Sequence, residues 1–439
     1  MLFKNIMVCQ NGKIHNDQFV RVTGKTISYV GSEEPEHIRD EETVDGVNRI
    51  MLPGFVNTHS HIPMTLLRGY GEGLPLDRWL KEKMFPFEDR MTGDDMYWGT
   101  SLGLLEMIAS GTVSYSDMYY HIDEISRATA EAGVKANIAR GVVKNPAFPS
   151  WQEHIAKKEI EELQDLVRQS NWDDLIKVEV SIHGEYTSDA KLVREVADFS
   201  RERGLPVHIH LSETESEHLA SIERHGMTPA AYFESLGLFD GPVLAAHCVH
   251  VSDEDIDILK NHEVTVAHCI SSNLKLGSGF APLKKFMDRG IRVTLGTDGA
   301  ASNNNLDYMQ EMHLAAMVHK GLNRDSMFLS PPEILAMASR NGFLAQGRPN
   351  SGEIREGCDA DLILISTESP QMTPAYDQLS NIIYSATAED VCFTMVNGKV
   401  LYDHGEYLTL DKEKILYHAG QSQRRIVAEL EGGTRHESP

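Results

Sequence analysis

The chain reads Pro53-Gly54-Phe55-Val56-Asn57-Thr58-His59-Ser60-His61 where a short apolar run passes into polar residues. We interpret this stretch as a buried β-strand that ends in two histidines. Side chains two residues apart on a strand point to the same face, so both imidazoles lie on one side of it. An HxH pair carries little weight alone, because about one arises by chance in a chain this rich in histidine. Indeed, His208-Ile209-His210 is a second example.

Seven further apolar runs follow this strand, and helical stretches separate them. Segments 157–168 and 191–203 carry apolar residues at i, i+3 and i+4 spacing, which is typical of amphipathic helices. Strand–helix alternation repeated about eight times predicts an α/β protein with a (β/α)8 barrel of the TIM type. A doubly wound sheet is the rival fold, but no GxGxxG or GxxxxGK[ST] pattern follows any run. The runs cover residues 112–115, 136–139, 176–182, 206–209, 243–246, 264–267 and 291–295.

Both ends of the chain differ from this middle part. The first fifty residues contain short runs rich in β-branched residues, and residues 361–365 have the same character. Residues 392–401 read as a hairpin around Asn397-Gly398. We therefore expect residues 1–52 and 352–439 to fold together into a small β-sandwich domain, with the barrel formed by residues 53–351.

Histidines and acidic residues gather at the carboxyl ends of the predicted strands. That end of a TIM-type barrel is where active sites form. Several imidazoles with one carboxylate and an open position suit Zn²⁺, with Fe²⁺ as the alternative metal. Besides His59 and His61, the set comprises Asp117, His183, His210, Glu213, His247, His268 and Asp298.

Composition and charge exclude several classes of partner. The chain has 41 Lys and Arg against 65 Asp and Glu, a formal net charge of −24 that repels phosphate backbones and anionic lipid surfaces. No apolar run approaches the roughly 20 residues of a membrane-spanning helix. We therefore predict neither a nucleic-acid nor a membrane partner. The five cysteines are scattered and form no CxxC pair, which favours free thiols in the cytoplasm.

The chain resembles the amidohydrolase superfamily. Within it, the chain is most similar to the branch that contains S-adenosylhomocysteine/5′-methylthioadenosine deaminases and triazine chlorohydrolases. The resemblance runs over nearly the whole length, and it implies a metal-dependent barrel with a small β-sandwich built from both termini. Besides residues 53–61, it rests on the stretches at 63–69, 85–90, 210–214, 246–250, 272–277 and 295–304.

The resemblance also implies roles for individual residues in a hydrolytic deamination. One metal ion per chain, Zn²⁺ or alternatively Fe²⁺, is expected on His59, His61, His210 and Asp298. Glu213 would protonate the ring nitrogen next to the attacked carbon, and His247 would orient the attacking water. Asp298 would take the proton of that water and pass it to the departing ammonia.

The implied substrate is an adenosine-type nucleoside, such as 5′-methylthioadenosine, S-adenosylhomocysteine, adenosine or 5′-deoxyadenosine. Glu88 is expected to hold the ribose hydroxyls, His183 to reach the purine, and Trp79 to lie near the sugar. Arg140 would face the 5′ substituent. Family members that hold a free amino-acid tail share a second arginine shortly after the third strand, whereas residues 142–151 offer only Lys144. This departure makes S-adenosylhomocysteine the less secure substrate.

Other functions remain as alternatives. The nearest is a chlorohydrolase or aminohydrolase that acts on a triazine or another N-heterocycle; the presence of Glu213 and Asp298 together favours nucleoside deamination over it. A binuclear hydrolase needs a carboxylated lysine at the end of the fourth strand, where His183 stands. The nucleic-acid-editing deaminases need a CxxC, which is missing. An inactive scaffold protein would have lost metal ligands that this chain keeps, and a homo-oligomer is left open.

Three further expectations concern residues near these motifs. His208 is expected to pack in the barrel wall without a direct role. His268 is favoured as a hydrogen-bonding neighbour of the attacking water. Glu215 and Glu217 are expected on the solvated surface.

Overall fold

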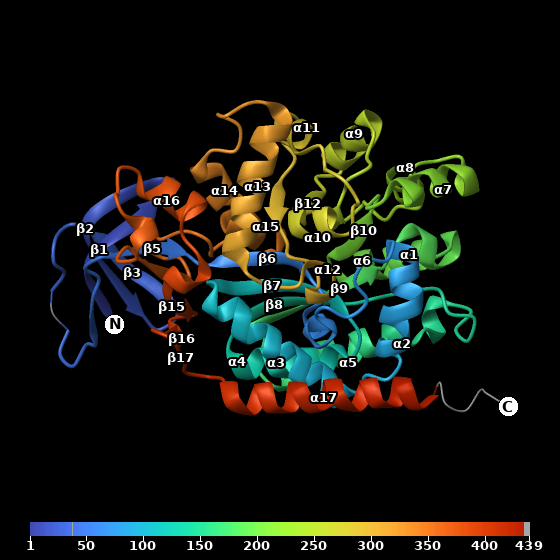
Figure 1. Cartoon of the computed structure of the whole chain (residues 1–439), viewed down its shortest axis with the longest axis horizontal. Helices are drawn as coiled ribbons and strands as arrows, with labels where there is room; N and C mark the ends of the chain where they lie inside the picture. Colours follow the sequence, from blue (N-terminus) through green and yellow to red (C-terminus); the bar gives the residue numbers. More distant parts are fainter. Residues whose placement is uncertain (37, 434–439) are drawn as a thin grey trace.

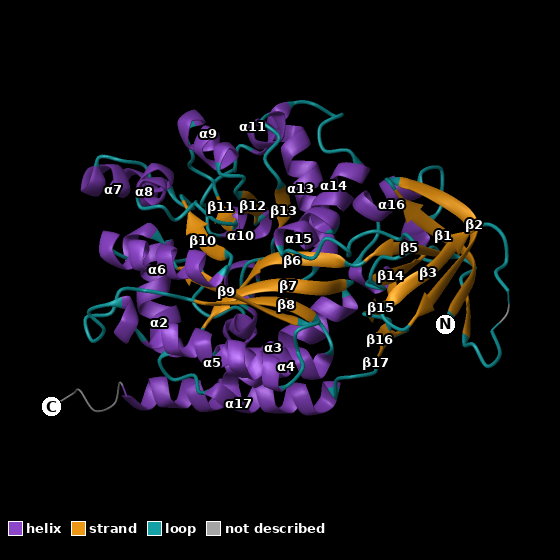
Figure 2. Cartoon of the chain, turned by 180° about the vertical axis from the view of Figure 1, so that it is seen from behind, coloured by secondary structure: helices purple, strands orange, loops and turns teal. Residues whose placement is uncertain are grey.

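Eight parallel strands form the centre of the molecule. The structure is a computed structural model that describes residues 1–36 and 38–433. Each strand pairs in parallel with the next one along the chain, and helices surround the strands (Figures 1 and 2). The predicted TIM-type barrel is therefore confirmed. Its strands are β6 (Phe55–Ser60), β7 (Thr112–Tyr119), β8 (Lys135–Arg140), β9 (Ile176–Ile182), β10 (Val207–Leu211), β11 (Val243–His247), β12 (Thr265–His268) and β13 (Val293–Leu295).

Hydrogen bonds that involve side chains join the first and last strands of this sheet. The Thr58 hydroxyl donates to the Leu295 carbonyl at 2.8 Å, and the Asn57 side-chain oxygen accepts from the Thr297 amide at 3.0 Å. The Asp298 amide then donates to the His59 carbonyl at 2.9 Å. This closure brings the HxH stretch and the aspartate after β13 side by side.

The helices that follow the strands cover the outside of the barrel, and short side chains cap several of them. Asp189 and Thr214, for example, accept hydrogen bonds from the first turns of α6 and α7. These helices are α3 (Gly93–Ala109), α4 (Ile122–Ala132), α5 (Ile155–Gln169), α6 (Ala190–Arg203), α7 (Glu215–His225), α8 (Pro229–Ser235), α9 (Asp253–Asn261), α10 (Ile270–Lys275), α11 (Leu283–Asp288), α12 (Ala300–Asn303), α13 (Tyr308–Asn323), α14 (Pro331–Ala338) and α15 (Arg340–Ala345).

Short helical segments lie in the connections. The segment after β6 forms η1 and then the consecutive helical segments α1, η2 and α2. Residues of these last three segments line the candidate site. Their bounds are η1 (Ile62–Leu67), α1 (Leu76–Trp79), η2 (Leu80–Met84), α2 (Phe85–Glu88), η3 (Trp151–Glu153), η4 (Glu185–Thr187), η5 (Pro370–Met372), α16 (Gln378–Tyr384) and η6 (Ala388–Asp390).

The two chain ends meet in one largely antiparallel sheet beside the barrel (Figure 1). The junction is the antiparallel pairing of β5 with β14, which joins strands from opposite ends of the chain. The order across the sheet is β17 (Glu406–Tyr407), β16 (Lys399–Asp403), β15 (Val391–Val396), β14 (Leu362–Ser366), β5 (Arg49–Pro53), β1 (Leu2–Gln10), β2 (Lys13–Thr23) and β3 (Thr26–Gly31), with β4 (Thr43–Asp45) paired to β1.

The last helix, α17 (Lys412–Gly433), leaves this sheet and runs along the barrel (Figure 1). It packs on α3, where Arg425 forms an ion pair with Asp95. The Trp98 ring stacks on His418 with centroids 4.1 Å apart. Helix α17 lies within residues 352–439, which were expected in the terminal domain, yet it contacts the barrel directly.

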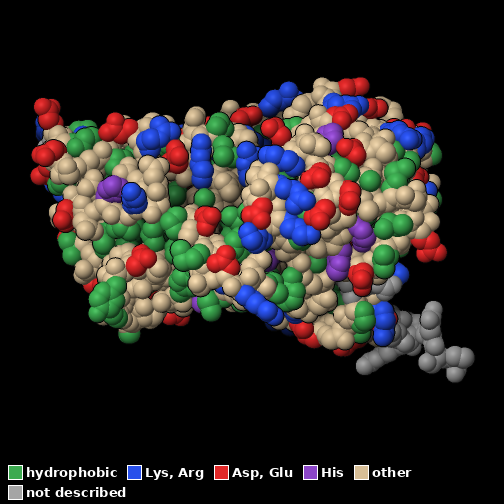
Figure 3. Space-filling model, turned by 90° about the horizontal axis from the view of Figure 1, so that it is seen from above, with side chains coloured by type: hydrophobic (Ala, Val, Ile, Leu, Met, Phe, Trp, Pro, Cys, Tyr) green, Lys and Arg blue, Asp and Glu red, His purple; other side chains and the backbone are tan. Residues whose placement is uncertain are grey.

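The surface carries both kinds of charge. On the face drawn in Figure 3, acidic and basic side chains are interspersed. Among the helices of the described residues, none is long and apolar enough to cross a lipid bilayer.

Candidate active site

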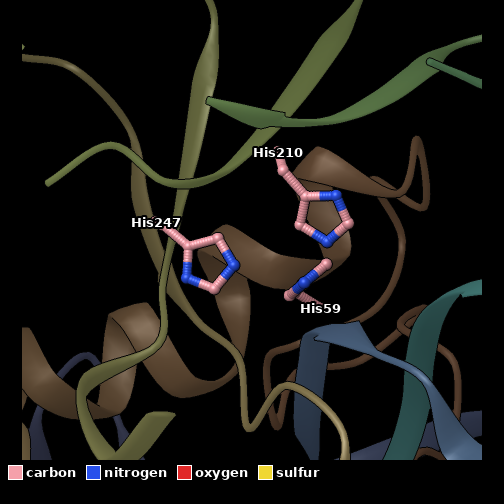
Figure 4. Close-up of side chains that lie close together, drawn as sticks. All are labelled: His59, His210 and His247. Atoms are coloured by element: carbon pink, nitrogen blue, oxygen red, sulfur yellow. The ribbon is translucent and has the colours of Figure 1, made fainter. Parts of the chain in front are cut away.

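Three histidines and an aspartate from distant parts of the chain converge at the carboxyl end of the barrel. His61 Nε2 lies 3.2 Å from His210 Nε2 and 3.3 Å from Asp298 Oδ1. His59 Nε2 lies 3.5 Å from the same Asp298 oxygen. His247 joins from β11: its ring and those of His59 and His210 point toward one another in Figure 4, with nitrogens within 4.8 Å. These atoms are close enough to share one ion.

The hydrogen bonds of two of these histidines determine which ring nitrogen is free. His61 Nδ1 lies 2.6 Å from the Met118 carbonyl, and His210 Nδ1 lies 2.6 Å from the His183 carbonyl. A carbonyl oxygen only accepts, so each Nδ1 carries the proton and each neutral ring presents a lone pair at Nε2. Two lone pairs 3.2 Å apart beside a carboxylate repel one another unless a cation lies between them.

His59 adds a second sign of a cation site. Its ring is fully buried, and within the described part of the chain its Nε2 has no hydrogen-bond partner. Burial lowers the pKa of His59 to about 3, so this ring is neutral. Buried polar atoms are nearly always paired. The donor set of imidazole nitrogens and one carboxylate oxygen therefore fits a metal ion.

Asp298 is held with one oxygen turned toward the histidines. The hydroxyls of Ser272 and Ser302 donate to its Oδ2 at 2.6 and 2.8 Å. Burial would raise the pKa of this carboxyl, but the adjacent imidazoles of His59, His61 and His247 hold it well below its usual range. Its backbone is left-handed at φ 61°, which is uncommon for a residue other than glycine and typical of functional sites.

Glu213 and His247 form a second pair beside this cluster. His247 Nε2 lies 3.9 Å from Glu213 Oε2, and Ser278 donates to the other Glu213 oxygen at 3.2 Å. Burial raises the pKa of Glu213. For His247, burial acts to lower the pKa, but Glu213, Asp298 and a hydrogen bond with Asn273 raise it above its ordinary value. Both raised pKa values favour a proton on this pair, next to the cluster.

Glu217 corrects an expectation from the sequence. It was expected on the solvated surface, yet it is only 9% exposed. Its two oxygens accept hydrogen bonds from the backbone amides of Ser212 and Glu213, the second at 2.8 Å. Burial and the charge of Glu213 raise the pKa of Glu217 to about 7. Glu217 thus anchors the loop that carries Glu213, while Glu215 is exposed as expected.

One cavity contains most of the residues singled out from the sequence. Glu88 lies in its wall and accepts a hydrogen bond from the Tyr119 hydroxyl at 2.5 Å. Burial raises the pKa of Glu88, and the bond from Tyr119 opposes that rise. His59 lies behind the cavity wall rather than in it. The predicted residues that line the cavity are His61, Trp79, Glu88, His183, His210, Glu213, His247 and Asp298.

Arg140 lies in an adjoining cavity, which shares Glu88 and His183 with the first. Its guanidinium pairs with Glu159 and lies over the ring of Tyr120, 4.7 Å from the centroid. Lys144 also lines this second cavity, and it pairs with Asp189 at 2.8 Å. Both cations near the expected 5′ end are thus already neutralised by carboxylates.

Two histidines have partners that the sequence did not reveal. His268 Nε2 lies 2.9 Å from His319 Nε2 on α13, and its role beside the attacking water stays a prediction. His208 does pack in the barrel wall, but its Nε2 lies 2.9 Å from His59 Nδ1. Periodicity alone places a side chain on a face and does not reveal its partner. Residues that sequence reasoning missed include Tyr119, Ser272, Asn273 and Ser302, although two of them lie in the 272–277 stretch.

The fold and this metal-binding cluster together define a metal-dependent hydrolase barrel. The sequence pattern described as "Amidohydrolase family" matches residues 50–401, and the chain belongs to that family.

Relatives named as deaminases match almost the whole chain. A 5-methylthioadenosine/S-adenosylhomocysteine deaminase of Dictyoglomus thermophilum is 44% identical over 89% of this chain and 90% of its own. A 5′-deoxyadenosine deaminase of Methanocaldococcus jannaschii is 38% identical over 97% of this chain and 99% of its own.

Solved structures agree on the fold. A zinc-containing adenosine deaminase of Xanthomonas campestris superimposes with a TM-score of 0.90 at 28% identity, covering 97% of this chain and 98% of its own. An atrazine chlorohydrolase of Arthrobacter aurescens reaches 0.88 at 22% identity, over 96% of this chain and 99% of its own. At that identity, the second likeness concerns the fold alone.

Proposed function

We propose that this protein is a zinc-dependent deaminase that hydrolyses the 6-amino group of an adenosine-type nucleoside, releasing ammonia and the inosine-type product. One observation carries the proposal: a single cavity is lined by His61, His210 and Asp298 of the cluster, by the buried acid Glu213 and by the carboxylate of Glu88. The activities for which the relatives are named support the same substrate class.

His59, His61, His210 and Asp298 are the proposed ligands of one ion per chain, with Fe²⁺ as the alternative to Zn²⁺. The Nε2 lone pairs of His61 and His210, and the Asp298 Oδ1 that faces the histidines, support this set. Held by these residues, zinc would supply one piece of chemistry: it would lower the pKa of water from 15.7 to about 7 and so make the nucleophile available at neutral pH.

Glu213 protonates the purine ring nitrogen next to C6. Hydroxide attack on C6 is unfavourable until that nitrogen is protonated, and the raised pKa of Glu213 keeps the proton available. His247, held by Asn273, orients the attacking water. Asp298 accepts the proton of that water and passes it to the amino group. A C–O bond forms at C6, the C–N bond breaks, and ammonia leaves. The ring nitrogen keeps its proton, and the second proton of the water passes to Glu213 as the C6 carbonyl forms.

The other end of the cavity is proposed to hold the nucleoside. Glu88, oriented by Tyr119, accepts hydrogen bonds from ribose hydroxyls. His183 is half-buried, and desolvation lowers its pKa to about 4, so its neutral ring can contact the purine. Trp79 contributes apolar surface near the sugar. These contacts require a ribose and favour a nucleoside over a free base or a triazine.

The second cavity favours an uncharged 5′ substituent. Arg140 and Lys144 are paired with Glu159 and Asp189, so a substrate carboxylate would have to compete with both ion pairs. 5′-Methylthioadenosine and 5′-deoxyadenosine carry no such carboxylate. We therefore expect higher kcat/KM for these two than for S-adenosylhomocysteine.

The test is ammonia release from the zinc-loaded enzyme. The panel comprises adenosine, 5′-deoxyadenosine, 5′-methylthioadenosine, S-adenosylhomocysteine, guanine, cytosine and a chlorotriazine, with metal content measured in parallel. Turnover of the adenosine compounds is expected. Activity only on a free base or on the triazine would overturn the proposed substrate and favour the heterocycle hydrolase.

Replacing the proposed acid tests its role. Glu213→Gln should retain zinc but lose at least ~10²-fold in kcat, because a positioned acid contributes about 10²–10⁴-fold. Glu215→Gln is the matched control: the same change, two residues away, on an exposed side chain. Equal turnover of the two variants would remove Glu213 from the mechanism.

A further inference from the structure

His59 differs from the other two histidines of the cluster in what holds its Nδ1. His61 and His210 each meet a backbone carbonyl there. His59 Nδ1 instead lies 2.9 Å from Nε2 of His208. An imidazole nitrogen can donate or accept, so this contact alone does not decide which nitrogen of His59 carries the proton. The decision depends on the other side of the His208 ring.

That other side faces a buried carboxylate. His208 Nδ1 lies 3.8 Å from Glu179 Oε2. Both atoms are buried, and neither has a hydrogen-bond partner among the described residues. His208 is fully buried and Glu179 is 2% exposed. The other oxygen of Glu179 accepts from Asn137 Nδ2 at 2.6 Å, which leaves Oε2 directed at His208.

We propose that Glu179 and His208 are positioning residues that hold the proton of His59 on Nδ1 and so keep its Nε2 free for the metal. Glu179 accepts from His208 Nδ1–H, and His208 Nε2 then accepts from His59 Nδ1–H. The 3.8 Å separation needs to shorten by about 0.6–1.1 Å to reach hydrogen-bond length. The inference rests on the proposed function, since it takes His59 as a ligand.

In this arrangement, one histidine lies between the carboxylate and the metal-binding histidine. A metal-bound histidine commonly donates its other N–H to a carboxylate or carbonyl, which fixes the tautomer. Here the carboxylate acts through an intervening imidazole from β10. Burial raises the pKa of Glu179 to about 7, with Asn137, Arg348 and Lys177 opposing the rise. Measurements at pH 8 therefore examine the carboxylate form.

Glu179→Gln keeps the size of the side chain but reverses the donor and the acceptor in each predicted hydrogen bond from residue 179 to His59. The glutamine oxygen can still accept from Asn137, which leaves its amide N–H facing His208 Nδ1. His208 would then donate from Nε2 to His59, and the proton of His59 would move to Nε2, the atom needed by zinc. We expect the zinc dissociation constant, measured by competition with a chromophoric chelator, to rise about 10–100-fold.

Glu311→Gln is the matched control. Glu311 is also fully buried, its pKa is also raised to about 7 by burial, and its oxygens accept from Ser271 rather than from a histidine. It should bind zinc within about threefold of the wild type. Loss of affinity in Glu179→Gln alone supports the inference, whereas equal affinity in both variants overturns it.

A second variant separates positioning from general damage. In His208→Gln the side-chain oxygen can accept from His59 Nδ1 without help from Glu179. The double variant His208→Gln/Glu179→Gln should therefore bind zinc less than about threefold more weakly than His208→Gln alone. An undiminished loss there would overturn the inference. If Glu179→Gln does not fold, His208→Leu removes the acceptor and should show the same 10–100-fold loss; unchanged affinity would overturn it equally.

The two proposals fail in different ways. A wild type that binds zinc but deaminates no adenosine compound would refute the proposed function, while the affinity series still decides the inference. A wild type that binds zinc and deaminates, with normal affinity in Glu179→Gln, would refute the inference alone. A wild type that binds no zinc would refute both.

Discussion

Lys135 ties the barrel to the terminal sheet through a buried ion pair, and its replacement by methionine should destabilise the protein strongly. Lys135 begins β8 and is 2% exposed. Its Nζ lies 2.6 Å from Asp361 Oδ2 and 3.0 Å from Asp359 Oδ2. Asp361 immediately precedes β14, and its other oxygen accepts from the Asn397 amide at 2.9 Å. Methionine keeps most of the apolar stem and removes only the charge.

The size of the effect follows from the burial of the partner. The Asp361 side chain is 0% exposed, so the variant leaves a buried carboxylate without its ion-pair partner. Removing one partner of a buried pair costs about 3–5 kcal/mol. With an unfolding entropy of about 2.1 cal/mol/K per residue, 439 residues correspond to about 0.9 kcal/mol/K. The Tm should therefore fall by about 3–5 °C.

Thermal unfolding followed by circular dichroism measures this shift. Lys25→Met is the control, because Lys25 also pairs with an aspartate across the two units, but both partners are exposed, at 58% and 63%. A pair of that kind contributes about 0–1 kcal/mol, so its Tm should change by less than about 1 °C. Lys135→Met/Asp361→Asn should recover part of the loss by removing the stranded charge. Equal shifts in the two single variants would refute the reasoning.

Two further predictions concern other ion pairs. Burial acts to raise the pKa of Asp95, but hydrogen bonds from Thr92 and the charge of Arg425 lower it below its ordinary value of 3.8. The ionised Asp95 therefore stabilises the folded protein fully above pH 3.8. This contribution is lost as the pH falls through the lowered pKa of Asp95 in the folded state. The difference in free energy of unfolding between wild type and Asp95→Asn should shrink in urea titrations from pH 7 toward pH 3, and a constant difference would contradict this. Glu159→Gln should free Arg140 and raise kcat/KM for S-adenosylhomocysteine about three- to tenfold relative to 5′-methylthioadenosine, by strengthening a charged contact. An unchanged ratio would mean that Arg140 does not meet the substrate tail.

Much of the fold could be predicted because its signals are local. A period of two along 53–61 places His59 and His61 on one face, and the alternation of strands with amphipathic helices predicts the barrel. The closing of a barrel then brings the strand ends together whatever the details of packing. The set of histidines and acids that includes the candidate ligands could thus be named from its place at the ends of the predicted strands, and the family resemblance then selected four of them.

The tertiary structure decided how those residues are held. Glu217 faces the backbone of the Glu213 loop instead of solvent, Arg140 is occupied by Glu159, and His268 contacts His319 rather than the cluster. His59 meets His208 across 149 residues of chain. Periodicity specifies the face of a strand or helix on which a side chain lies. The partner of that side chain, and therefore its proton, depends on which buried polar atoms packing brings within about 3 Å, where leaving one unpaired is costly.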